Sequence, residues 1–332
     1  MAKICTVIGC SHSPFLFMPP EVWDRVRAKR QVRKDVPRPS PEDNRRDFDR
    51  CMKAFSTLKE KIRAAKPDAL LIFGDDQCEQ FSFSNFPALG IYLGEDMEGE
   101  TKPVGFLHRV MGITDAPVTE DWTRAKGHPD FARQLMMGLM QSGFDLAFSL
   151  ELPDKEQGLG HAFLHPPYYL TPHYDIPIVP FFVNCFYAPQ PTGMRCYELG
   201  RAVRQVIEEC PLDLRIAVIG SGGLWHTPGV PEAYLDEEFD RTILEFVGMG
   251  AAREMAQYFD SRPWPYPSAT PDVAEKLLGG TGMAAGPGSG VGETRNWLIA
   301  AAVADGVKGS VVDYIPVYAS PCGMGFAYWD MN

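Results

Sequence analysis

Residues 69–77 read Ala-Leu-Leu-Ile-Phe-Gly-Asp-Asp-Gln, and this stretch decides the fold. Its first five residues are all apolar, which is typical of a strand that is buried on both faces. Before it, residues 41–66 repeat apolar positions at three- and four-residue steps among many charges, a pattern that predicts an amphipathic helix. Residues 4–9 form a similar apolar run and end in Cys10-Ser11-His12. Two buried strands separated by a helix indicate a parallel sheet with helices on its faces.

The same alternation continues toward the C-terminus. Further helices are predicted near 129–142, 194–210, 236–247, 250–259 and 293–304, and further strands near 145–148, 176–183, 214–219, 309–318 and 324–329. No internal repeat and no polar linker divides the chain. We therefore expect one α/β catalytic domain over residues 1–332, with a central, mostly parallel or mixed sheet flanked by helices on both faces. The Pro/Gly-rich segment 261–292 is expected to form a lid or an active-site loop.

Composition excludes several classes of protein. The chain has 332 residues, 45% of them hydrophobic and 23% charged, which is ordinary for a globular protein. A net charge of −11 disfavours binding to nucleic acid or to an anionic membrane surface. No apolar stretch reaches the roughly 18 residues that a membrane helix needs. The eight cysteines are widely spaced and form no Cys-x-x-Cys pair, so we expect reduced thiols and a cytoplasmic location.

Three of the predicted strands end in polar sequences. These are Ser11-His12-Ser13, Asp75-Asp76-Gln77, and a glycine-rich turn at 220–226 that ends in His226. One histidine after a strand is more commonly a hydrogen-bonded structural residue than a functional one. In a parallel sheet, however, all three loops would lie at the same edge, where ligands bind in α/β folds.

Two further segments carry candidate site residues. Residues 158–167 place His161 and His165 in a stretch bounded by glycines and two prolines, and the prolines argue against a helix there. One of the two imidazoles could equally be buried and structural. Glu293 follows the glycine-rich run 286–292 and opens a predicted helix, whose dipole would by itself stabilise an acid. No Lys-Ser/Thr pair follows the glycines, which disfavours a nucleotide site.

These residues, in this order, resemble the class III extradiol ring-cleavage dioxygenases, the superfamily of the protocatechuate 4,5-dioxygenase beta subunit. The matching pieces cover most of the chain, and the last two are the most specific: His12 before Ser-Pro, Asp-Asp-Gln-x-x-x-Phe at 75–81 where the family has Asn-Asp-His, Gly-His at 160–161, Gly-Ser-Gly-Gly-Leu-Trp-His at 220–226, and Gly-Glu-x-x-x-Trp-Leu at 292–298.

The resemblance implies a non-haem Fe(II) centre held by two histidines and one glutamate. Carried over by position, His12 is the first imidazole ligand and Glu293 the carboxylate, while Gln77 stands where the family has its other histidine. An amide oxygen is a weaker donor than an imidazole nitrogen. An inward-turned Asp75 or Asp76 is the alternative, and its harder oxygen would favour Mn(II) or another divalent metal such as Mg²⁺ over iron.

The resemblance also implies roles for the remaining residues. His226 would be the acid/base, and His161 would stabilise charge on a substrate oxygen. Gly222 and Gly223 would let the backbone pass close to the substrate ring, and His165 would also contact the substrate. The expected substrate is a catechol-like or aminophenol-like aromatic, with O₂ as co-substrate.

Two other functions stay open at this point. Gln77 favours a non-catalytic or metal-free partner subunit of such an enzyme. A metal-assisted hydrolase or lyase on the same scaffold is the second alternative. As for partners, we expect a homo-oligomer or a separate small partner subunit.

Overall fold

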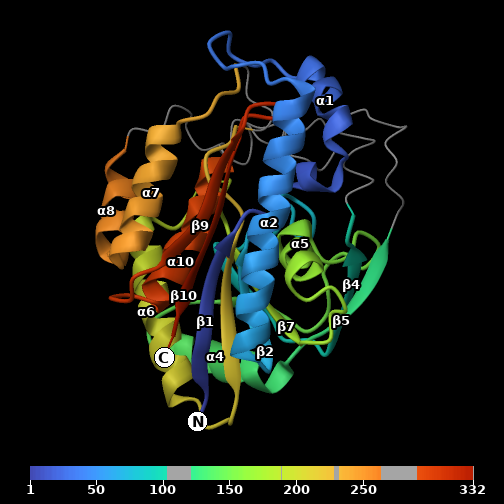
Figure 1. Ribbon diagram of the computed structural model, residues 1–332. Helices are drawn as coiled ribbons and strands as arrows, with labels where there is room; N and C mark the ends of the chain where they lie inside the picture. The colour runs from blue at the N-terminus through green and yellow to red at the C-terminus, as the bar shows by residue number, and fades with distance from the viewer. Residues whose placement is uncertain (103–120, 188, 228–231, 263–289, 332) are drawn as a thin grey trace.

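The computed structural model describes residues 1–102, 121–187, 189–227, 232–262 and 290–331, and these form a helix-covered mixed sheet (Figure 1). The eight strands lie in the order β6-β3-β7-β2-β8-β1-β10-β9. Four neighbouring pairs are parallel, namely β6/β3, β7/β2, β2/β8 and β8/β1, and the other three are antiparallel. The predicted fold class is confirmed. The strands are β1 (Lys3–Cys10), β2 (Ala69–Gly74), β3 (Leu89–Tyr92), β6 (Ala147–Ser149), β7 (Ile178–Val183), β8 (Arg215–Ser221), β9 (Ser310–Val317) and β10 (Cys322–Asp330).

Helices cover both faces of this sheet. One core contains Leu70 and Ile72 of β2 together with residues of α1, α2 and α5, and the other contains Leu71 and Phe73 together with residues of α4, α6, α7, α8 and α10. Successive side chains of a strand point to opposite faces, so the continuous apolar run of β2 serves both cores. The helices are α1 (Trp23–Lys29), α2 (Pro41–Ala65), α4 (Pro129–Gln141), α5 (His161–Leu170), α6 (Gly193–Glu209), α7 (Glu237–Met249), α8 (Ala252–Ser261) and α10 (Thr294–Val303).

The long helix α2 begins and ends where its sequence predicts. Ser40 accepts a hydrogen bond from the backbone N–H of Asp43, whose carboxylate accepts one from the N–H of Ser40, so the two form a capping box. At the other end Lys66 adopts the left-handed conformation that closes many helices.

Several predictions about local structure are wrong or incomplete. Pro166 and Pro167 lie inside the helix α5, although they were expected to prevent one. Strand β3 was not predicted because it has only four residues. The separate hairpin of β4 (Asp96–Glu100) and β5 (Trp122–Lys126) was not predicted because its strands are short and partly polar. Most of the expected lid, 263–289, lies outside the described residues. Within the described ranges, no helix combines the length and apolar character required to cross a membrane.

A close contact between β1 and α10 helps to position the site. A Cβ atom added to Gly9 of β1 would lie 2.6 Å from a ring carbon of Trp297 in α10, so only glycine fits against this indole. Trp297 is fully buried and donates a hydrogen bond to the carbonyl oxygen of Gly222 at 2.9 Å. The contact fixes α10, which Glu293 precedes, against the strand that His12 follows.

We predict that Gly9→Ala lowers the free energy of unfolding by about 1–3 kcal/mol, because the indole cannot move without disturbing the core. Denaturant unfolding of the variant beside the wild type measures this. Gly248→Ala in α7 is the matched control, since nothing lies within 4 Å of its added Cβ and alanine favours a helix by up to about 1 kcal/mol. Equal stability of the two variants would contradict the packing argument.

Candidate metal centre

The three polar strand ends meet at one edge of the sheet, as the sequence predicts. Strands β2, β8 and β1 are adjacent and parallel. Their carboxyl ends therefore deliver residues 75–77, the 222–226 turn and His12 to the same place.

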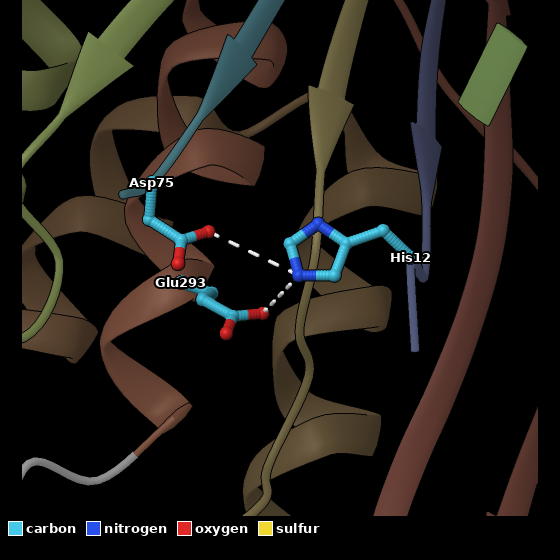
Figure 2. Close-up of side chains that lie close together, drawn as sticks. All are labelled: His12, Asp75 and Glu293. Atoms are coloured by element: carbon cyan, nitrogen blue, oxygen red, sulfur yellow. Dashed lines mark ion pairs between the residues drawn. The ribbon is translucent and has the colours of Figure 1, made fainter. Parts of the chain in front are cut away.

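His12, Asp75 and Glu293 form a buried cluster at this edge (Figure 2). Nε2 of His12 lies 3.3 Å from Oε2 of Glu293 and 3.9 Å from Oδ1 of Asp75. One nitrogen or oxygen atom from each of the three side chains lies within 4.8 Å of the others. The three side chains are only 4%, 0% and 1% exposed, and Oδ1 of Asp75 has no hydrogen-bond partner among the described residues.

A chain of hydrogen bonds fixes the imidazole of His12. Pro166 has no N–H, so the carbonyl oxygen of Ala162, four residues earlier in α5, lacks its usual helical donor. The Ser221 hydroxyl donates to this oxygen at 2.6 Å, and its Oγ lies 2.9 Å from Nδ1 of His12. Because the only hydroxyl proton is used on Ala162, Nδ1 must donate to Ser221. Nε2 then presents a lone pair to the two carboxylates.

The carboxylate of Glu293 links this cluster to the neighbouring turn. Its Oε2 accepts from the backbone N–H of Gly223 at 2.7 Å, and its Oε1 lies 3.1 Å from Nε2 of His226. Glu293 makes no capping hydrogen bond to its own helix. The helix dipole alone therefore does not explain this residue.

The hydrogen bonds of Gln77 and Asp76 differ from those expected of metal ligands. The amide nitrogen of Gln77 donates to Oδ2 of Asp75 at 3.2 Å and to Oε1 of Glu293 at 3.3 Å. Asp76 turns instead to the backbone, where its carboxylate accepts from the N–H groups of Gln80 and Phe81. The carboxylate that joins His12 and Glu293 is thus that of Asp75, while Gln77 ties the two acids together.

Burial and neighbouring charges both shift the pKa values of these groups. Burial raises the pKa of Asp75 well above its ordinary value, and the nearby Glu293 charge adds to this. Burial also opposes ionisation of Glu293, but the imidazole of His226 holds its pKa well below the ordinary value. Burial lowers the pKa of His12, which agrees with a neutral imidazole that donates only from Nδ1.

His226 lies between a carbonyl and a carboxylate. Its Nδ1 donates to the carbonyl oxygen of Leu224 at 2.9 Å, because a carbonyl can only accept. Burial opposes a charge on this ring, but the Glu293 carboxylate raises the pKa of His226 above its ordinary value. The nitrogen that faces the cluster is therefore Nε2.

The two histidines of α5 also reach this region. The ring of His161 lies edge-on to that of His12, with centroids 4.7 Å apart, and its Nδ1 lies 2.7 Å from the carboxylate of Glu79. Burial disfavours its charge, but Glu79 raises the pKa of His161 to about 9. His165 is fully buried. Its Nδ1 donates to the carbonyl oxygen of His12 at 2.6 Å, and its Nε2 has no hydrogen-bond partner in the part of the chain that the structure describes.

Gly222 and Gly223 lie against the cluster. Gly222 has a φ of +114°, and an added Cβ would lie 2.5 Å from Oε2 of Glu293 and 3.0 Å from the His12 ring. The observed reason for glycine here is close approach to these two side chains. Contact with a substrate ring remains a prediction.

Sequence reasoning missed Ser221 and Glu79. Ser221 lies inside the quoted 220–226 motif, but its hydrogen bond to α5 requires the three-dimensional fold. Glu79 lies two residues after Gln77 and is paired with a residue 82 positions away. Its position inside the 75–81 motif was the one available signal.

Residues 36–323 match the family described as the catalytic LigB subunit of aromatic ring-opening dioxygenase, and the chain belongs to this family. Over 183 residues it is 31% identical to a 2,3-dihydroxyphenylpropionate/2,3-dihydroxicinnamic acid 1,2-dioxygenase of Photorhabdus laumondii, covering 54% of this chain and 49% of the relative. Over 125 residues it is 34% identical to a gallate dioxygenase of Pseudomonas putida, covering 36% of this chain and 35% of the relative. The chain thus spans half or less of the length of these two relatives.

Among solved structures, an uncharacterized protein from Escherichia coli K12 aligns with 98% of this chain and 99% of its own length. The TM-score is 0.49 and the sequence identity 14%.

Proposed function

We propose that this protein is a metal-dependent extradiol-type dioxygenase that opens the ring of a small catechol-like aromatic, with an aminophenol-like compound as the other substrate class. Membership of the ring-opening dioxygenase family and the printed activities of the two relatives support this. The observation that carries the proposal is the buried meeting of His12, Asp75 and Glu293.

A divalent cation fits this cluster. A neutral His12 directs the lone pair of Nε2 toward two carboxylates. Gln77 donates to the other oxygen of each acid, so the oxygens nearest to Nε2 face the position of a cation. We propose His12, Asp75 and Glu293 as the ligands, in place of Gln77 or Asp76. Fe(II) follows from the family, while the second carboxylate also suits Mn(II). A bound metal would supply a meeting point for both substrate oxygens and dioxygen.

The histidines around the cluster have distinct tasks in this proposal. The Leu224 carbonyl keeps Nδ1 of His226 protonated, so His226 exchanges a proton with the substrate at Nε2. His161 stabilises charge on a substrate oxygen. Nε2 of His165, which no described residue hydrogen-bonds, is the proposed acceptor for a substrate hydroxyl.

The two alternatives have different support. Gln77 at the family's histidine position favours a metal-free partner subunit, but a loss of metal would leave the convergence of His12, Asp75 and Glu293 without a function. A hydrolase or lyase would use the same ligands without oxygen. Both alternatives give results in the experiments below that differ from those of a dioxygenase.

With Fe(II) added anaerobically, we expect the protein to consume one O₂ per catechol when air is admitted, because both oxygen atoms enter the product. An oxygen electrode and a panel of catechols and aminophenols measure this. Bound iron without oxygen uptake on any substrate would contradict the proposal, and turnover in the absence of oxygen would identify a hydrolase or lyase.

His12→Ala and His226→Ala should separate metal binding from proton transfer. We expect His12→Ala to lose the metal, and His226→Ala to keep it while turnover falls by about 10²–10⁴-fold. Metal analysis and oxygen uptake on both variants test this. Loss of metal in His226→Ala would instead make this residue part of the metal-binding set.

Asp75→Asn should weaken metal binding by at least about tenfold, because it removes a charged ligand. Gln77→His should tighten Fe(II) binding, since the side chain at this position already reaches both carboxylates and an imidazole would add a stronger donor. Isothermal titration with Fe(II) and Mn(II) under nitrogen measures both effects.

Exposed residues provide matched controls for these two variants. Asp130→Asn and Gln205→His change the same residue types on the outer surfaces of α4 and α6 and should leave the affinity unchanged. An Asp75→Asn variant that binds like Asp130→Asn would remove Asp75 from the ligand set. A Gln77→His variant that binds like Gln205→His would place residue 77 away from the metal.

A further inference from the structure

Glu79 and His161 form a pair beside the candidate metal centre that the proposed ligands do not use. Oε1 of Glu79 lies 2.7 Å from Nδ1 of His161 and accepts from the backbone N–H of the same residue at 3.3 Å. Both side chains are largely buried, at 18% and 13% exposed. Glu79 therefore holds the ring and the backbone of the first residue of α5.

The chain is shaped to allow this contact. A Cβ atom on Gly160 would lie 2.5 Å from Oε2 of Glu79, so a side chain at position 160 would push the carboxylate away. The Gly-His sequence at 160–161 thus has a physical reason: glycine makes room for the acid that binds the histidine.

The turn after β2 directs Glu79 to this place. Asp76 binds the N–H groups of Gln80 and Phe81, which closes the turn. Cys78 adopts a left-handed conformation with φ +62° and sends its thiol to the hydroxyl of Tyr187. A non-glycine residue holds such a conformation only when its surroundings compensate for the strain. As a result, Gln77 and Glu79, which precede and follow Cys78 in the chain, both reach the site.

We propose that Glu79 is the positioning residue for His161. A carboxylate only accepts hydrogen bonds, so its contacts hold the Nδ1–H and the backbone N–H of His161 and orient the ring so that its Nε2 edge meets a substrate oxygen. Within the part of the chain that the structure describes, no hydrogen bond occupies Nε2 of His161. The ring lies 4.7 Å from that of His12, so it borders the space beside the cluster. This inference rests on the proposed function, because it assigns His161 a substrate oxygen as its partner.

A double-mutant cycle tests the proposal. We expect Glu79→Ala to lower kcat/KM for the best catechol by about 10- to 100-fold, mainly through kcat, with unchanged metal content. In a His161→Ala background the same change should have no further effect, because Glu79 acts only through this ring. Glu79→Gln should recover part of the activity, since its amide oxygen can still accept from Nδ1. Glu151→Ala, an exposed acid paired with Lys155, is the control.

Three results would overturn the proposal: activity of Glu79→Ala equal to that of Glu151→Ala, losses that add in the double variant, or loss of metal from Glu79→Ala. If Glu79→Ala does not fold, the cycle is run with Glu79→Gln, which has nearly the same size.

A second readout is independent of turnover. Nitrogen-15 NMR of the metal-free protein should show His161 protonated at Nδ1 in the wild type and no longer fixed in that form in Glu79→Ala. An identical pattern in both proteins would overturn the proposal. If the wild type consumes no oxygen, the proposed function fails, while the NMR comparison still decides whether Glu79 sets the state of His161.

Discussion

The site depends on the contacts of one buried carboxylate, that of Glu293. An ionised carboxylate without water is costly unless donors and positive charge surround it. Here its donors come from separate parts of the fold: Gly223 after β8, His226 in the same turn, and Gln77 after β2. His12 after β1 lies with Nε2 3.3 Å from Oε2 of the same carboxylate. The contacts of this one acid therefore bring together the ends of three adjacent strands.

A second constraint links the helix on the opposite face to the same point. Pro166 frees the carbonyl of Ala162, Ser221 donates to it, and His12 donates to Ser221. A residue that weakens helix α5 thus sets which nitrogen of His12 faces the acids. The proline that argued against a helix in the sequence is part of the reason that the site has its geometry.

The sequence predicts the strong elements because their signals are local. Five consecutive apolar residues mark β2, and the spacing of apolar residues marks α2. The meeting of three strand ends follows from the parallel pairing. The choice between Asp75 and Asp76 does not follow, because the turn that separates their directions depends on hydrogen bonds to Gln80 and Phe81. Likewise, the partners of Ser221 and Glu79 are distant in the chain and leave no periodic pattern.

The contacts of Gln77 give a physical meaning to its proposed position in place of a metal-binding histidine. The Gln77 amide nitrogen carries two protons, and it binds Oδ2 of Asp75 and Oε1 of Glu293. The oxygens that Gln77 does not bind, Oδ1 of Asp75 and Oε2 of Glu293, are those nearest to Nε2 of His12. A histidine could offer only one proton from each ring nitrogen and could not tie both acids with a single atom. Two negative charges held in this way balance the charge of one divalent cation. In the proposed site, Gln77 and Asp75 together take the place of a second imidazole: Gln77 orients the acids, and Asp75 is the proposed source of the ligand oxygen.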